Sequence, residues 1–134
     1  MKQTLIDTDI LSLFLRGHPR VTAQFQAYAR EYNRVNFSIV TYYEILSGFK
    51  HRDARKQITV FLEFTGRNNV IPLTEASVNA SADMYAATRA KGTPIDDIDL
   101  LIAGIAYAND WSLATHNRKH YERIANLDIQ DWSE

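Results

Sequence analysis

Acidic side chains are the residues of this sequence whose type and spacing suggest chemistry. Asp7 and Asp9 follow the short apolar run Leu5-Ile6, so they stand at the carboxyl end of an expected strand. Glu44 lies near the start of an expected helix, and three more acids precede an apolar segment: Asp96, Asp97 and Asp99. In open α/β sheets, ligands bind at the edge where strands end and helices begin. The spacing therefore predicts that carboxylates from distant parts of the chain converge.

Converging carboxylates repel one another and raise each other's pKa unless a cation lies among them. Mg2+ or Mn2+ suits such a site, because these hard ions prefer oxygen ligands and retain bound water. An ion of this kind can activate water and neutralise a phosphodiester, which is the chemistry of nucleic-acid hydrolysis. A helix cap is the alternative for each acid taken alone, and Thr41 followed by Glu44 fits a capping box.

The elements that must position these acids alternate along the chain. Short apolar segments predict strands at 4–6, 35–39, 70–73 and 113–115 and around Ile129. Helical patterns fall between them, from a cap at Thr8 or Asp9 to Gly17, and at 19–32, 41–49, 54–64, 75–91, 99–109 and 117–123. This alternation predicts an α/β fold, a three-layer α/β/α sandwich with a mostly parallel sheet of roughly five strands.

Composition narrows the class of protein. The 134 residues, 46% hydrophobic and 23% charged, predict a single domain over residues 1–134. The absence of cysteine excludes a disulfide scaffold, a cysteine zinc site and a thiol nucleophile, and it favours a reducing compartment. Neither a signal peptide nor an apolar run long enough to cross a bilayer is present, so we expect a cytoplasmic protein.

Four segments in order resemble the successive motifs of PIN domains, in particular those of VapC toxins of bacterial type II toxin-antitoxin pairs. They are Leu5-Ile6-Asp7-Thr8-Asp9-Ile10-Leu11, Thr41-Tyr42-Tyr43-Glu44-Ile45-Leu46-Ser47-Gly48, Gly92-Thr93-Pro94-Ile95 leading into Asp99-Leu100-Leu101-Ile102-Ala103, and Leu113-Ala114-Thr115-His116-Asn117. The similarity continues through Tyr121 to Ile124 and on to Trp132, so it covers the whole chain.

The resemblance implies a ribonuclease that cleaves RNA with Mg2+, for which Mn2+ can substitute. It also implies a homodimer held inactive by a cognate VapB-like antitoxin. Asp7, Glu44 and Asp99 match the three acidic positions, and they are the implied catalytic and metal-binding residues. Asn117 falls where many relatives carry a fourth acid, so it joins the catalytic set but brings no charge. The choice of Asp99 over Asp96 and Asp97 depends on this match.

Neighbouring polar residues are expected to support those acids. Thr8 and Thr115 lie beside matched positions, and their hydroxyls can orient a carboxylate or a metal-bound water; a cap or turn is an equal alternative. Asp9 and Asp97 can supply some of the charge that Asn117 lacks. His116 and His120 are spaced to share a metal on one helix face, but a solvated face is the stronger expectation.

An RNA substrate also needs positive charge. The net charge is −1, but bases outnumber the acids that remain once Asp7, Glu44 and Asp99 are set aside. Candidate contacts to the RNA backbone are Arg16, Arg20, the run Lys50-His51-Arg52, and Arg55-Lys56. A solvated helix face is the alternative for each of them.

Three rival classes share part of this pattern. An Asp-x-Asp after a first strand also opens phosphatases of the haloacid-dehalogenase type, in which the first Asp is a nucleophile, but here Ile10-Leu11 replaces their following threonine. Receiver domains need an Asp after the third strand, where this chain has Leu73-Thr74. A catalytically silent PIN scaffold used only for binding stays open, although three intact acids argue against it.

Overall fold

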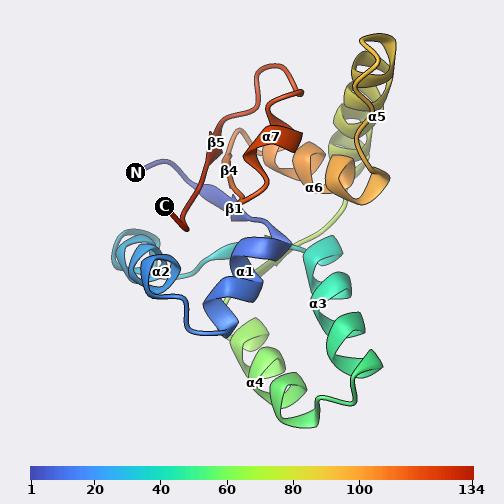
Figure 1. The fold of residues 1–134 in the computed structure, drawn as a ribbon. Coiled ribbons are helices and arrows are strands. Elements are labelled where there is room, and N and C mark those ends of the chain that lie inside the picture. Colours follow the sequence, from blue (N-terminus) through green and yellow to red (C-terminus); the bar gives the residue numbers. More distant parts are fainter.

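A parallel five-stranded sheet forms the centre of the computed structural model, which describes residues 1–134 (Figure 1). The strands are β1 (Thr4–Ile6), β2 (Asn36–Ser38), β3 (Asn69–Ile71), β4 (Ser112–Ala114) and β5 (Ile129–Gln130). Their order is β3-β2-β1-β4-β5, and every neighbouring pair is parallel. The predicted α/β class and strand number are therefore confirmed, and all five expected strands are present within one or two residues at each end.

Seven helices connect and cover these strands. They are α1 (Thr8–Leu15), α2 (Pro19–Tyr32), α3 (Ile39–His51), α4 (Arg55–Gly66), α5 (Glu75–Ala90), α6 (Asp97–Ala108) and α7 (Arg118–Tyr121). None is long and apolar enough to pass through a bilayer.

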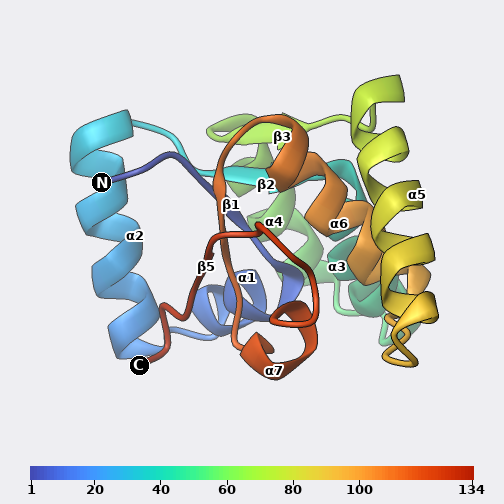
Figure 2. The same cartoon turned by 90° about the horizontal axis from the view of Figure 1, so that it is seen from above.

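Two hydrophobic cores lie on opposite faces of the sheet. Side chains alternate along a strand, so Ile6 packs with α1, α2 and α4, whereas its neighbour Leu5 packs with α5, α6 and α7. Figure 2 shows the resulting layers, with α2 on one side of the strands and α5 and α6 on the other. Helix α3 contributes to both cores, through Ile45 to the first and Val40 to the second. The three-layer α/β/α arrangement is thus as predicted.

Two helix caps differ from the sequence expectation, and α6 begins two residues earlier than expected. Ser38, the last residue of β2, caps α3 by accepting a 2.9 Å hydrogen bond from the Thr41 amide, so the capping box proposed for Thr41 and Glu44 is wrong. Asp7 caps α1 by accepting from the Thr8 amide at 2.8 Å, in place of Thr8 or Asp9. Both helices begin directly at the end of a strand, because the capping residue is also the residue that ends or follows the strand.

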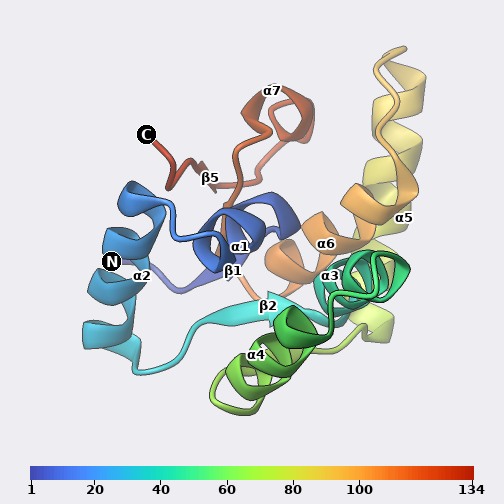
Figure 3. The ribbon, with the colours of Figure 1, turned by 60° about the horizontal axis from the view of Figure 1, so that its bottom comes forward.

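The sheet topology brings the strand ends of interest to one edge. Since β1 lies between β2 and β4 and all three are parallel, the residues that follow them share that edge. Helix α6 leads into β4 and so begins at the same edge. Figure 3 shows the consequence, with α1, α3 and α6 next to one another at this end of the molecule.

Candidate metal centre and nucleic-acid site

Asp7 is the buried centre of the acidic site. Its side chain is only 5% exposed, and its two oxygens are fixed by different elements. Oδ1 accepts from the Thr8 amide, and Oδ2 accepts a 2.8 Å hydrogen bond from the Thr115 hydroxyl at the end of β4. Burial, together with the neighbouring charges of Asp9 and Asp99, raises the pKa of Asp7 to about 8, against the lowering effect of these two hydrogen bonds.

Asp9 ties the start of α1 to the loop after β4. Oδ1 accepts from the Ile10 amide at 2.7 Å, and Oδ2 accepts from the His116 amide at 3.0 Å. Burial raises the pKa of Asp9 above its ordinary value, while these two backbone hydrogen bonds lower it. Because both oxygens already accept backbone N–H groups, Asp9 orients the loop and contributes negative charge beside Asp7.

Glu44 reaches the site through threonine hydroxyls. The Thr8 hydroxyl donates a 2.6 Å hydrogen bond to Glu44 Oε1 and lies 2.9 Å from the hydroxyl of Thr41. Thr41 is fully buried, and Glu44 is half-buried on α3. Thr8 therefore links the first acidic motif to the second, as expected of a residue that orients a carboxylate.

Asp99 lies in the first turn of α6 and contacts an imidazole. Its Oδ2 is 2.9 Å from His120 Nδ1, with both side chains about a quarter exposed. The amide nitrogen of the Asn117 side chain lies 3.1 Å from the same His120 nitrogen. Asn117 itself is exposed, and its side chain contacts His120. Its backbone amide donates a 3.0 Å hydrogen bond to the Thr115 hydroxyl, which in turn donates to Asp7.

Tyr121 was not anticipated as a member of the site. Its ring is fully buried in α7, and its hydroxyl lies close to Asp99 without forming a hydrogen bond of good geometry. Burial raises the pKa of the Tyr121 hydroxyl far above its ordinary range, and the charges of Asp7, Asp99 and Asp9 and the contact with the Asp99 carboxylate act in the same direction. The sequence placed Tyr121 in the closing segment of the family resemblance but indicated no role in the site, because an aromatic side chain at that position equally suits a core.

Other expected residues lie outside this cluster. Asp96 and Asp97 are exposed at the start of α6, and neither side chain forms a hydrogen bond or ion pair. The two histidines do not share a metal position: His116 Nδ1 contacts Asp131 at 3.1 Å, whereas His120 contacts Asp99. The geometry thus separates Asp99 from its two acidic neighbours, which spacing alone could not do.

These oxygen ligands suit a hard cation that keeps several bound waters better than one surrounded entirely by protein side chains. No three Asp, Glu, His or Cys side chains are arranged to surround an ion. Mg2+ commonly takes only one or two carboxylates and completes its shell with water. Asp7 and Asp99, whose charges disfavour each other, suit that arrangement, with Glu44 adjacent through Thr8. The residues present therefore fit a divalent ion.

A parallel α/β domain with an acidic centre at the carboxyl ends of its strands is the class that fold and site define together. The family model described as PIN domain matches residues 4–127. The chain belongs to this family.

Relatives cover nearly the whole chain. The chain is 28% identical over 130 residues to ribonuclease VapC1 of Haemophilus influenzae strain R2866, covering 96% of this chain and 97% of the relative. It is 24% identical over 134 residues to the tRNA(fMet)-specific endonuclease VapC of Shigella flexneri, covering 99% and 100%.

Solved structures agree with the fold. A crystal structure of DNA-bound VapBC from Salmonella typhimurium has a chain that superposes with a TM-score of 0.88 at 25% identity, covering 98% of this chain and 99% of that one. VapBC-1 from nontypeable Haemophilus influenzae gives a TM-score of 0.83 at 28% identity, covering 98% of each chain.

Proposed function

We propose that this protein is a metal-dependent endoribonuclease of the VapC type, the toxin of a toxin-antitoxin pair. The ion is Mg2+, with Mn2+ able to replace it; Asp7 and Asp99 hold it directly, and Glu44 holds it through the water that completes its shell. A VapB-like antitoxin is the protein partner, and RNA in the cytoplasm is the substrate. The PIN match and the VapC ribonucleases among the relatives support the activity, and the VapBC complexes among the similar structures support the partner.

The observation that carries the metal proposal is the burial of Asp7. An ionised carboxylate there is opposed by desolvation and by two neighbouring acids, and no cationic side chain contacts it. A divalent ion would remove this electrostatic cost. When bound, such an ion activates a water molecule for attack on phosphorus and neutralises the phosphodiester.

The chain's own residues hold the carboxylates ready for that ion. Thr115 and the Thr8 amide fix the plane of the Asp7 carboxylate from two directions. The Thr8 hydroxyl fixes Glu44, and His120 holds Asp99 from the exposed side. Asn117 completes the set through its backbone amide, which donates to the Thr115 hydroxyl. Orientation of ligands by surrounding hydrogen bonds is a general requirement of metal sites.

Cleavage of purified RNA tests the activity. The protein should cut RNA in Mg2+ or Mn2+ and lose that activity in chelator. Asp7→Asn should lower the rate at least about a hundredfold, because it removes a metal ligand without changing side-chain size. Asp83→Asn, which neutralises an exposed acid on α5, is the matched control and should cut normally. Near-normal cleavage by Asp7→Asn would show that the site is assigned to the wrong residues.

Thermal melting gives a reading of metal binding that does not depend on activity. Added Mn2+ should raise the melting temperature of the parent, because a ligand that binds only the folded state stabilises it. Asp99→Asn should gain less from Mn2+, and in chelator it should melt no lower than the parent, since one of several repelling charges is gone. A clearly lower melting temperature in chelator would mean that Asp99 serves mainly to stabilise the start of α6.

A further inference from the structure

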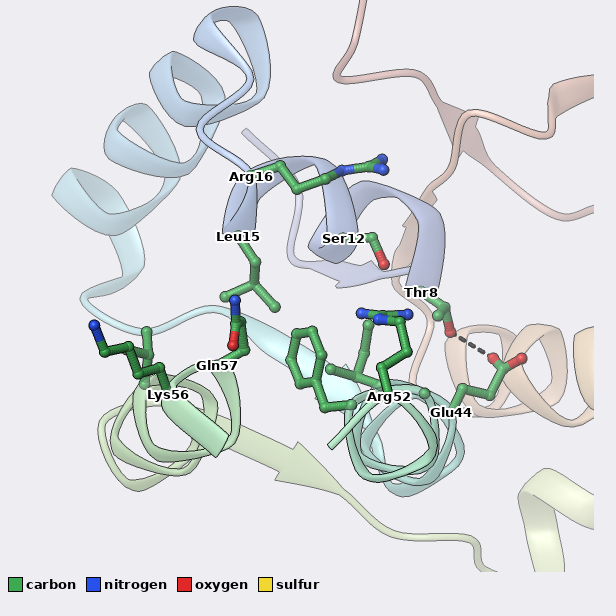
Figure 4. A pocket seen from close by; sticks show the side chains of 12 residues that line it. Thr8, Ser12, Leu15, Arg16, Glu44, Arg52, Lys56 and Gln57 are labelled. Atoms are coloured by element: carbon green, nitrogen blue, oxygen red, sulfur yellow. Dashed lines mark hydrogen bonds between the residues drawn. The ribbon is translucent and has the colours of Figure 1, made fainter. Parts of the chain in front are cut away.

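A cavity of about 640 Å³ opens beside the acidic centre, between α1, α3 and α4. Thr8 and Glu44 line one end of it, so the cavity continues directly from the residues proposed to hold the metal (Figure 4). Leu15, Ile45 and Phe49 line its inner wall. Whatever occupies this cavity lies next to the proposed metal site.

Positive charge dominates the polar lining. Arg16 extends from the end of α1, Arg52 from the end of α3 and Lys56 from the first turn of α4. All three are exposed, and none forms an ion pair with a carboxylate of the chain. Glu44 is the only acid in the lining, and Thr8 already donates to it.

The two arginines lie on different elements of the cavity lining. Figure 4 shows the Arg52 guanidinium reaching from α3 towards Ser12, whereas the Arg16 side chain runs along the outer side of α1, past Ser12. Arg52 also lies over the Phe49 ring, with its guanidinium carbon 5.4 Å from the ring centre. A planar guanidinium in this position keeps donor groups free for phosphate oxygens.

We propose that this cavity binds the RNA strand next to the scissile phosphate, with Arg16, Arg52 and Lys56 contacting backbone phosphates. The inference rests on the proposed ribonuclease function and adds the path of the substrate. A polyanion complements three cations that lack partners, and the apolar wall at Phe49 offers a surface for a nucleobase. An apolar protein segment would leave all three charges without a partner.

RNA binding without cleavage tests the proposal. The Asp7→Asn protein would be titrated into a fluorescein-labelled twelve-nucleotide single-stranded RNA of mixed sequence at several salt concentrations. In that background, Arg52→Gln should weaken binding about fivefold to tenfold, and Arg16→Gln with Arg52→Gln should weaken it further. Each lost phosphate contact should lower the slope of log affinity against log salt by about 0.7.

Arg67→Gln is the control, because it removes the same charge from the far end of α4, outside the cavity. It should leave RNA affinity within about twofold of the parent. In the cleaving protein, Arg52→Gln should raise KM with little change in kcat, as expected when ground state and transition state lose the same contact. All of these variants replace exposed side chains, so their melting temperatures should match that of the parent.

Two results would overturn the proposal. The first is an unchanged affinity and salt slope in the doubly substituted protein. The second concerns binding of labelled poly-glutamate, an acidic peptide. If the doubly substituted protein lost this binding while its RNA affinity and KM stayed at the parent values, the cavity would be assigned to a protein partner. A parent protein that binds RNA but does not cleave it in Mg2+ or Mn2+ would contradict the proposed function alone.

Discussion

Asp7 makes the stability of the metal-free protein depend on pH. Its pKa is about 8 in the folded state against an ordinary value of 3.8, so the folded protein binds the proton more tightly than the unfolded chain. The contribution of Asp7 to stability is therefore fully present below about pH 4 and is lost as pH rises towards about 8. In chelator, the melting temperature of the parent should fall across this range. Asp7→Asn should remove most of the fall, whereas Asp83→Asn should keep it.

Asp131 should affect the pH dependence of stability in the opposite direction, because its pKa is lowered and not raised. Ser133 and His116 lower the pKa of this carboxyl by hydrogen bonding and charge, against the effect of burial. Its contribution to stability is lost only as pH falls below about 4, outside the Asp7 window. A melting temperature that rises between pH 5 and 8 in chelator would contradict the assignment of Asp7 as a buried, unfavourable anion.

We expect the protein to become more stable when the Tyr121 hydroxyl is removed. A buried polar group without a partner costs about 1 to 3 kcal/mol, and Tyr121→Phe removes only that oxygen while the ring stays packed. We expect the variant to be more stable by about 1 kcal/mol in chelator. Urea unfolding would measure it.

Tyr28→Phe is the matched control for this prediction. The Tyr28 hydroxyl is also buried, but it accepts hydrogen bonds from the Thr4 amide at 3.1 Å and from the Asn36 side chain at 3.2 Å. Its removal should destabilise the protein by about 1 kcal/mol. Equal losses in the two variants would mean that Tyr121 donates to one of the acids in solution.

At the residue scale, the sequence predicted which acids come together better than it predicted their contacts. Asp7 and its strand could be recognised because an acid directly after a short apolar run marks a strand end and matches the first motif, although Asp7 also caps α1. The role of Glu44 could not be recognised, because Thr41, three residues earlier, gives the pattern of a capping box. Only the structure shows that Ser38 is the residue that caps α3. No pattern indicated a role for Tyr121 in the site, because its hydroxyl matters only where distant acids surround it.

At the scale of elements, the contact between α5 and α6 depends on a glycine. A Cβ on Gly104 would lie 2.5 Å from the Ser77 carbonyl oxygen and would also meet the Ser81 hydroxyl. Ser81 cannot easily move, since it donates to the Leu100 carbonyl at 2.7 Å and to Ser77 at 3.0 Å. Gly104→Ala should therefore destabilise the protein by about 1 to 3 kcal/mol, measured by urea unfolding.

Gly66, unlike Gly104, has room for a larger side chain. It ends α4, and a Cβ there would meet nothing within 4 Å. Gly66→Ala should be neutral or stabilising by up to about 1 kcal/mol, because alanine favours the helix. A Gly104→Ala protein as stable as Gly66→Ala would mean that α5 and α6 are not packed as closely as the structure has them.

Element boundaries were less predictable than element types. The second helix was expected at its observed bounds because Pro19 starts it and its apolar spacing is regular. Helix α3 was expected two residues too late, since Ile39 extends the apolar run of β2 and reads equally well as strand. Helix α6 begins at Asp97, where three acids in four residues mask the start. Sequence cannot separate a strand end from a helix start when the two are adjacent.

At the scale of the whole molecule, the alternation of strands and helices was enough to predict a parallel layered fold. The strand order was not predicted, because which strands become neighbours depends on how the helices cover the two faces of the sheet. The resemblance of the motifs located the acids on the chain. The cavity beside them could not be foreseen, since α1, α3 and α4 form it together and no single motif contains its basic residues.

Association of two copies is the prediction that belongs to this scale. Tyr42, Tyr43 and Phe49 give α3 more apolar bulk than one buried stripe needs, which led us to expect a homodimer. Tyr42 and Phe49 instead pack against the first core, and only Tyr43 is strongly exposed, at 64%. Further large apolar side chains are exposed on α5 and α6: Val78, Tyr85 and Tyr107. A symmetric dimer is the simplest assembly that would cover such residues.

Light scattering at tens of micromolar should give about twice the chain mass of 15.4 kDa. Tyr43→Ser should shift the equilibrium towards monomer, because aromatic residues contribute strongly to interface cores. Leu62→Ser, which makes a comparable change at an exposed site on α4, is the control and should leave the dimer intact. A parent that stays monomeric as its concentration rises would disprove the dimer, and equal weakening by both substitutions would place the interface elsewhere than α3.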